Sequence, residues 1–153
     1  MRILVDADAC PVKDEVYRVG GRHGLEVTIV SNSPLRISAG SLVTLVVVGE
    51  GIDVADDWIA DNVREDDIVI TGDIPLAARV LRRGAHAIGF PGRAFTPENI
   101  GDALATRDLL AGLREQGEGG NGPAPFRKQD RSRFLQELER VIQQVRRNLL
   151  VDL

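Results

Sequence analysis

The sequence predicts an α/β protein with a mostly parallel β-sheet and flanking helices. Short runs of β-forming residues alternate along the chain with helical segments, as they do in βαβ units. The composition, 43% hydrophobic and 27% charged, is that of a globular protein, and 153 residues make one domain the default. The one cysteine, Cys10, cannot form an internal disulfide, which excludes a disulfide scaffold and is typical of a reducing compartment.

The first half of the chain predicts three strands and one helix. Arg2–Asp6 is an apolar run typical of a buried strand. Pro11 suits the first turn of a helix that extends to about Arg22, with Gly20, Gly21 and Gly24 as its stop signal. Leu25–Ser31 alternates like a second strand, and the turn-rich residues 32–40 predict a loop. Leu42–Val48 is continuous and β-branched, which predicts a strand buried on both faces.

The second half continues the alternation. Asp53–Val63 is expected to be a helix and Asp67–Thr71 a strand. Ile74–Arg83 is expected to form a helix that ends at Gly84, and His86–Phe90 the last strand. Thr96 and Pro97 then provide an N-cap and a first-turn proline for a helix to about Glu115.

The C-terminal part is expected to be a single amphipathic helix joined to the domain by a flexible loop. Residues 117–125 hold four glycines and two prolines, which separates an α/β domain at 1–116 from a C-terminal segment at 126–153. Within Asp130–Leu150, apolar residues recur at spacings of three and four: Phe134, Leu135, Leu138, Val141, Ile142 and Val145. This pattern predicts docking, either on the domain or across a homodimer.

The distribution of charge and the length of the apolar runs indicate which partners and which cellular location to expect. From Phe126 onward there are seven basic and four acidic residues, a net +3, whereas the first 125 residues carry 12 basic and 19 acidic residues, a net −7. This distribution fits an acidic metal site beside a polyanion-binding surface, and it equally fits a solvated helix. No apolar run approaches the roughly 18 residues that span a bilayer, and no signal peptide is evident, so we expect no membrane partner and a cytoplasmic location.

Aspartates follow three of the predicted strands. Asp6 and Asp8 lie at the end of the first strand, Asp53 and Asp56 open the helix after the third, and Asp73 follows the fourth. Because ligands of parallel sheets bind at the carboxyl ends of the strands, we expect these carboxylates to converge. Converging carboxylates repel one another unless a cation offsets their charge. Ligand sets made only of oxygen favour Mg²⁺ or Mn²⁺.

Simpler explanations exist for some of these aspartates. Asp73 and Asp53 each precede a predicted helix and could serve as N-caps, and Asp8 could be an ordinary turn residue.

Asp56 fits these explanations least. At 100° per residue it falls within about 20° of Val63 on the apolar stripe Ile52, Ala55, Ile59 and Val63, so it faces inward. Asp57 and Asp61 fall on the opposite face and are expected to be solvated.

Several motifs resemble a known family. The segments DADACP at 6–11, GIDVADDWI at 51–59, ITGDIPLA at 70–77 and FTPENI at 95–100 look like the YaiI/YqxD family. RD at 107–108, GGNGPAPF and DRSRF at 130–134 fit the same pattern over nearly the whole chain. The family is similar to PIN-like and NYN-type domains, which implies a Rossmann-like fold with an acidic pocket of a metal-dependent nuclease. By motif, that pocket corresponds to Asp6, Asp8, Asp53, Asp56 and Asp73.

These observations lead to a functional hypothesis of Mg²⁺- or Mn²⁺-dependent phosphodiester hydrolysis, with RNA as the substrate. Asp6, Asp56 and Asp73 would be the catalytic residues and main metal ligands, and Asp8 and Asp53 would complete the shell or orient water. Polar and basic residues near the strand ends are candidates for substrate binding: Asn32, Thr71, Lys13, Arg18, Arg36 and Arg107.

Two alternatives remain open. One is a non-catalytic metal- or RNA-binding module. The other is a phosphatase that uses Asp6 as a nucleophile, against which Cys10 stands where such enzymes usually have threonine or valine.

Overall fold

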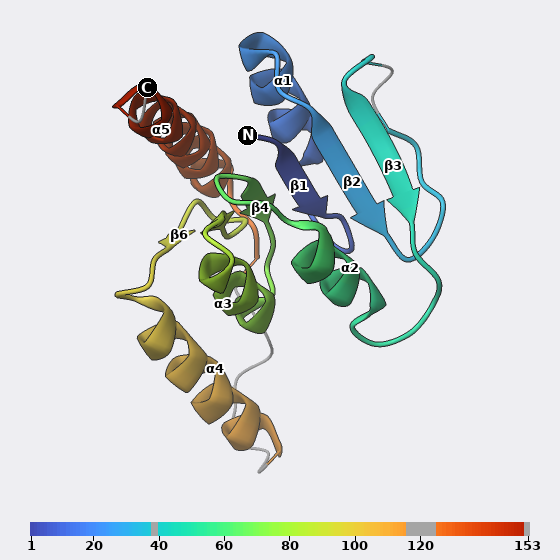
Figure 1. The fold of residues 1–153 in the computed structure, drawn as a ribbon. Coiled ribbons are helices and arrows are strands. Elements are labelled where there is room, and N and C mark those ends of the chain that lie inside the picture. The colour runs from blue at the N-terminus through green and yellow to red at the C-terminus, as the bar shows by residue number, and fades with distance from the viewer. Residues whose placement is uncertain (38–39, 116–124, 152–153) are drawn as a thin grey trace.

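The computed structural model describes residues 1–37, 40–115 and 125–151. Strands and helices alternate along these residues, which confirms the predicted α/β fold (Figure 1). In chain order the elements are β1 (Ile3–Asp6), α1 (Lys13–His23), β2 (Val27–Ser31), β3 (Val43–Val47), α2 (Val54–Asn62), β4 (Ile68–Ile70), α3 (Ile74–Arg82), β5 (His86–Ile88), β6 (Ala94–Phe95), α4 (Ile100–Glu115) and α5 (Lys128–Val151).

The six strands form one sheet in the order β3-β2-β1-β4-β5-β6. All neighbouring pairs are parallel except β5 and β6, which are antiparallel. The chain runs outward from β1 to β3 and then returns to β4 on the other side of β1, so the strand order reverses between β1 and β4. In Rossmann-like sheets a ligand binds at the carboxyl edge beside this reversal, and here the two strands end at Asp6 and Ile70.

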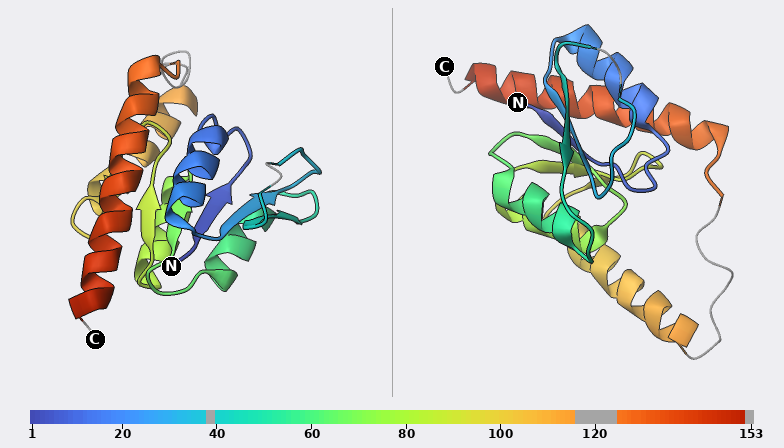
Figure 2. Two further views of the ribbon diagram at one scale, coloured as in Figure 1. Left: turned by 90° about the horizontal axis from the view of Figure 1, so that it is seen from above. Right: turned by 90° about the vertical axis from the view of Figure 1, so that its right-hand side faces the viewer.

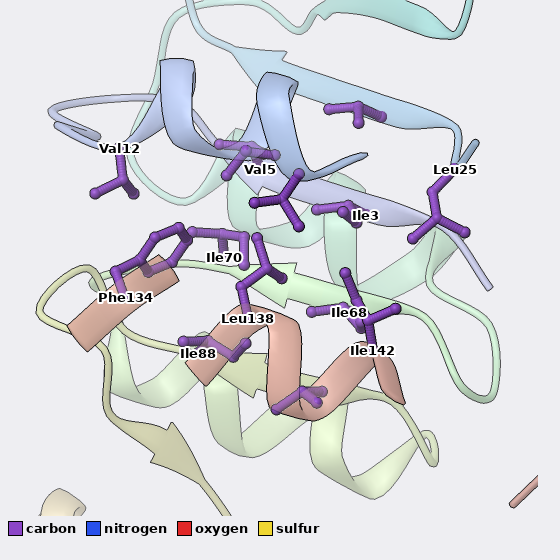
Figure 3. Packing of buried hydrophobic residues seen from close by; sticks show 14 of the residues in the cluster. Ile3, Val5, Val12, Leu25, Ile68, Ile70, Ile88, Phe134, Leu138 and Ile142 are labelled. Carbon is purple, nitrogen blue, oxygen red and sulfur yellow. The ribbon is translucent and has the colours of Figure 1, made fainter. Parts of the chain in front are cut away.

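Helices cover both faces of the sheet (Figure 2). Alternate strand residues supply two cores, because successive side chains point to opposite faces. On one face, Ile3, Val5 and Ile70 pack under α1 and α5, where Phe134 and Leu138 are fully buried (Figure 3). On the other face, Leu4, Val30 and Val69 pack under α2 and α3. The C-terminal helix therefore docks on the domain of its own chain.

The third strand differs from its prediction. β3 lies at the edge of the sheet rather than at its centre, and none of its residues is fully buried. Val47 is 48% exposed. The continuous apolar run at 42–48 therefore does not mark burial on both faces, and β3 pairs only with β2 in the sheet.

Some details of the predicted elements were also wrong. The first helix ends at His23, within one residue of its predicted end, and Gly24 caps it in the left-handed conformation with φ +67°, but Gly20 and Gly21 lie inside α1 and do not stop it. The predicted last strand is followed by the two-residue strand β6. Thr96 does accept a hydrogen bond from the amide of Asn99, but the regular helix α4 begins only at Ile100.

The helix α4 contacts the rest of the domain mainly at its N-terminal end, where Ala103 is buried in the core shared with α3. Its remainder projects away from the sheet (Figures 1 and 2). The glycine- and proline-rich loop predicted at 117–125 lies outside the described residues except for Pro125. No helix in the described part of the chain is long and apolar enough to cross a membrane.

Candidate functional site

A chain of hydrogen bonds links the ends of β1, β4 and the start of α3. Asp6, the last residue of β1, is 9% exposed, and its Oδ2 accepts a hydrogen bond of 2.8 Å from the hydroxyl of buried Thr71. The same hydroxyl oxygen accepts a hydrogen bond of 2.9 Å from the amide of Asp73. Asp73 Oδ1 in turn caps α3 by accepting a hydrogen bond of 2.9 Å from the amide of Leu76. Two carboxylates are thereby held in place by groups at the carboxyl edge of the sheet.

Asp73 therefore does have the N-cap role that its sequence context suggested. The cap uses one carboxylate oxygen, Oδ1, and a carboxylate offers two oxygens to donors or cations. Capping and participation in the acidic cluster are compatible at this residue, and the cap fixes the direction of the side chain.

The start of α2 brings two more aspartates to the same edge. Asp53 precedes the helix in a left-handed conformation with φ 65°, and its side chain makes no capping hydrogen bond. Ala55 and Ile59 are buried, and Asp56 beside them is half-buried, as the helical spacing predicts. Ile52 is the exception: it lies before the helix and is 92% exposed, so the apolar stripe begins at Ala55.

The carboxylates at this edge interact with one another strongly. Burial, the charges of Asp73 and Asp6, a side-chain hydrogen bond with Asp73 and the charge of Asp53 together raise the pKa of Asp56 to about 7. Burial also raises the pKa of Asp6, partly offset by the hydrogen bond from Thr71 and reinforced by the charges of Asp8 and Asp73. The five predicted aspartates thus form one electrostatic cluster, which we call the acidic cluster: Asp6, Asp8, Asp53, Asp56 and Asp73.

The loop after β1 carries further features of the site. Asp8 is exposed, and the next residue, Ala9, adopts a left-handed φ of 60°, which costs a non-glycine residue about 1–2 kcal/mol. Lys13 reaches over this loop, with its Nζ 3.5 Å from the carbonyl oxygen of Ala7. Burial raises the pKa of the Cys10 thiol to about 11, so this thiol stays protonated at neutral pH.

The donor atoms of the acidic cluster fit a hard divalent cation, since all of them are carboxylate oxygens. Among the described residues, however, no three acidic, histidine or cysteine side chains stand close enough together to hold a metal ion as they are placed. Burial and the neighbouring carboxylates raise the pKa of Asp56 to about 7, and protonation of Asp56 reduces the repulsion that a cation would otherwise offset. Binding a cation would require Asp56 to lose that proton and the carboxylates to reorient.

The predicted outward-facing aspartates lie apart from the acidic cluster. Asp57 is exposed and its Oδ1 pairs with Arg79 at 2.8 Å, and Asp61 is exposed. Of two adjacent acids on α2, one joins the cluster and the other binds a surface arginine.

The predicted substrate-binding residues are distributed over several surfaces. Thr71 and Lys13 belong to the site as described above. Asn32 directly follows β2, and its Oδ1 is buried without a hydrogen-bond donor in the described part of the chain. Arg36 lies in a separate surface pocket beside α1, together with Arg18.

Arg107 lies on α4 in a groove that also contains Gly72, next to Asp73. The same groove contains Arg93, which sequence reasoning missed. The only sequence signal for Arg93 was its place in a glycine-containing turn after the fifth predicted strand.

Comparison with known proteins gives one consistent result. Residues 4–144 match the model of a family described as uncharacterised, the YaiI/YqxD family. A UPF0178 protein of Parvibaculum lavamentivorans is 59% identical over 145 residues, which cover 95% of each chain. UPF0178 proteins of Mesorhizobium japonicum and Rhodospirillum rubrum are 56% and 52% identical, covering 92% and 96% of this chain and 90% and 99% of their own. No solved structure matches.

Proposed function

The chain belongs to the YaiI/YqxD family, and we propose that it is a divalent-metal-dependent nuclease that hydrolyses phosphodiester bonds in RNA. The observation that carries this proposal is the mutual interaction of Asp6, Asp56 and Asp73, which come from three different elements. Burial first, and then the charges of Asp73, Asp6 and Asp53, raise the pKa of Asp56 to about 7, and a divalent cation would offset the repulsion among these carboxylates. The similarity to PIN-like domains and the cytoplasmic location belong to the same proposal.

The protein groups have separable roles in this proposal. Asp6, Asp56 and Asp73 would hold Mg²⁺ or Mn²⁺, with Asp8 and Asp53 available to complete the shell. When bound, the cation would supply Lewis-acid activation of water and neutralise charge on the attacked phosphate. Thr71 keeps the carboxylate of Asp6 oriented, and the α3 amide of Leu76 does the same for Asp73.

The test is cleavage of a labelled single-stranded RNA with Mg²⁺, with Mn²⁺ and with a chelator. We expect the wild-type protein to cleave the RNA only with a divalent cation. We expect no cleavage by Asp6→Asn, and circular dichroism checks that this variant is folded like the wild-type protein. The matched control is Asp57→Asn, which removes an equal charge outside the acidic cluster and should leave cleavage intact.

The other outcomes identify the alternatives. RNA that is retarded on a gel but stays intact in every condition indicates a non-catalytic binding module. Release of phosphate from a small monoester, with a beryllofluoride adduct on Asp6, indicates a phosphatase. Cleavage that survives Asp6→Asn contradicts the proposal.

A further inference from the structure

A groove runs between α4 and the start of α3, beside the acidic cluster. Its volume is about 390 Å³, near the lower end of the roughly 300–1,000 Å³ typical of small-ligand pockets. Residues of the β4–α3 connection, the β5–β6 turn and α4 line it, including Gly72, Ile74, Arg93, Thr106, Arg107 and Leu110. The groove has room for one nucleotide rather than for a double helix.

The α4 wall of the groove is one face of the helix. Ala103, Thr106, Arg107 and Leu110 are spaced by three, four and seven residues, which places them on one side. Only Ala103 of these four is buried, and Leu110 is 45% exposed. The face of α4 that lines the groove is therefore buried at Ala103 and exposed at Thr106, Arg107 and Leu110. In Figure 2 this part of α4 projects from the domain.

The groove carries two exposed cations. Arg107 pairs with its neighbour Asp108 at 3.3 Å, and exposed pairs of this kind contribute little, so its guanidinium can exchange partners at small cost. Arg93 lies over the ring of Phe95, 5.8 Å from the centroid. Two guanidinium groups in one narrow groove suit a phosphate, which they can bind through paired hydrogen bonds.

The groove also adjoins the proposed catalytic groups. Gly72 stands between Thr71 and Asp73 in the chain, so a ligand in the groove lies next to the acidic cluster. The cluster alone repels a polyanion, and Arg93 and Arg107 offset that repulsion at its border. Ile74 and Leu110 add apolar surface on which a base could rest.

We propose that this groove binds one nucleotide of a single-stranded nucleic acid, with Arg93 and Arg107 on a phosphate and Ile74 and Leu110 against the base. The proposal rests on the proposed function and names how its substrate is held. Unpaired strands can place a base on such a surface, whereas a duplex keeps its bases stacked inside.

The experiment measures fluorescence anisotropy of a labelled single-stranded oligouridylate with chelator present, so that binding is observed without cleavage. Arg93→Ala and Arg107→Ala are each expected to weaken binding about tenfold and to lower the salt dependence by about one unit of slope. Leu110→Glu, at an exposed position, is expected to weaken binding without loss of an arginine. The control is Arg82→Ala, which removes an exposed arginine from the far end of α3.

Each outcome decides the proposal. Binding lost in the groove variants and kept in Arg82→Ala supports it. Equal loss in all arginine variants, no loss in any, equal affinity for a duplex, or no binding by the wild-type protein overturns it. Failure of the proposed function is distinguishable, because metal-dependent cleavage is measured separately: a groove that binds RNA in a protein that never cleaves leaves this proposal standing and removes the nuclease.

Discussion

Asp56→Asn should stabilise the metal-free protein at neutral and alkaline pH. The substitution keeps the size of the side chain and its ability to hydrogen-bond Asp73, and it removes a charge that burial disfavours and that Asp73, Asp6 and Asp53 repel. In the wild-type protein, ionised Asp56 is a source of strain at any pH above its raised pKa. Asparagine has no such ionised state.

The magnitude follows from the pKa of Asp56, which is raised from 3.8 to about 7. At about 1.36 kcal/mol per pH unit this shift corresponds to about 4 kcal/mol, and solvent screening at a half-buried carboxylate reduces it to about 1–2 kcal/mol. Because the folded pKa lies above the unfolded one, the folded state binds the extra proton between about pH 4 and pH 7. The wild-type protein therefore loses stability as pH rises through this window.

The assay is urea unfolding with chelator at pH 4.5 and at pH 8, for wild type, Asp56→Asn and Asp57→Asn. We expect Asp56→Asn to gain about 1–2 kcal/mol over wild type at pH 8, or about 3–6 °C in melting temperature for a chain of this size, and little at pH 4.5. Asp57→Asn should gain nothing, because Asp57 pairs with Arg79 on the surface. An advantage that is absent at pH 8, or that does not change with pH, would refute the electrostatic account of the cluster.

Three further changes test the fold by urea unfolding. Phe134→Ala should cost about 3–5 kcal/mol, since the ring is fully buried between α5 and the sheet, and a loss below about 1 kcal/mol would show that α5 is not part of the core. Gly92→Ala should cost at least about 2 kcal/mol, because φ is +93° and the new Cβ would lie 2.6 Å from the backbone of Arg133; an unchanged midpoint would contradict this packing. Glu139→Gln should destabilise the protein more at pH 7 than at pH 3. The hydrogen bond with His23 lowers the pKa of Glu139 from 4.5, so the stabilisation is present above that value and is lost as pH falls through the lowered pKa; an effect equal at both pH values would exclude this contact as its cause.

The sequence was sufficient to predict most strands and helices of the α/β domain, because apolar residues recur with a different period in a strand than in a helix. The apolar spacing of α5 predicted its buried face, including Phe134 and Leu138. Edge position was not predictable in the same way. A β-branched run such as residues 42–48 has the same sequence pattern in a central strand and in an edge strand. The number of strands that pair with it depends on the topology of the whole sheet.

Short elements and helix ends were harder to predict for local reasons. β6 has only two residues and no period that a sequence pattern could reveal. Gly20 stays inside α1 because the helix packs there at close range: a Cβ at this position would lie 2.8 Å from Cγ2 of Val27. A glycine that permits close packing and a glycine that ends a helix look the same in the sequence.

The acidic cluster was accessible to sequence reasoning because its members sit at strand and helix ends. The angular position of Asp56 on the predicted helix distinguishes it from Asp57 in the sequence alone. The sequence did not indicate that Asp73 would cap a helix and join the cluster together, since that depends on how its two carboxylate oxygens are directed. Arg93 was missed because its place beside α4 depends on how α4 leaves the domain.

The most direct test of the central claim, that the acidic cluster binds a divalent cation, is the melting temperature in millimolar Mn²⁺. At a hundredfold excess over Kd, binding to the folded state adds about 2.7 kcal/mol, which is about 5–10 °C for a chain of this size. We predict this rise for the wild-type protein and for Asp57→Asn, and its loss in Asp56→Asn. An unchanged melting temperature of the wild-type protein in Mn²⁺ and in Mg²⁺, or an equal rise in Asp56→Asn, would contradict the account.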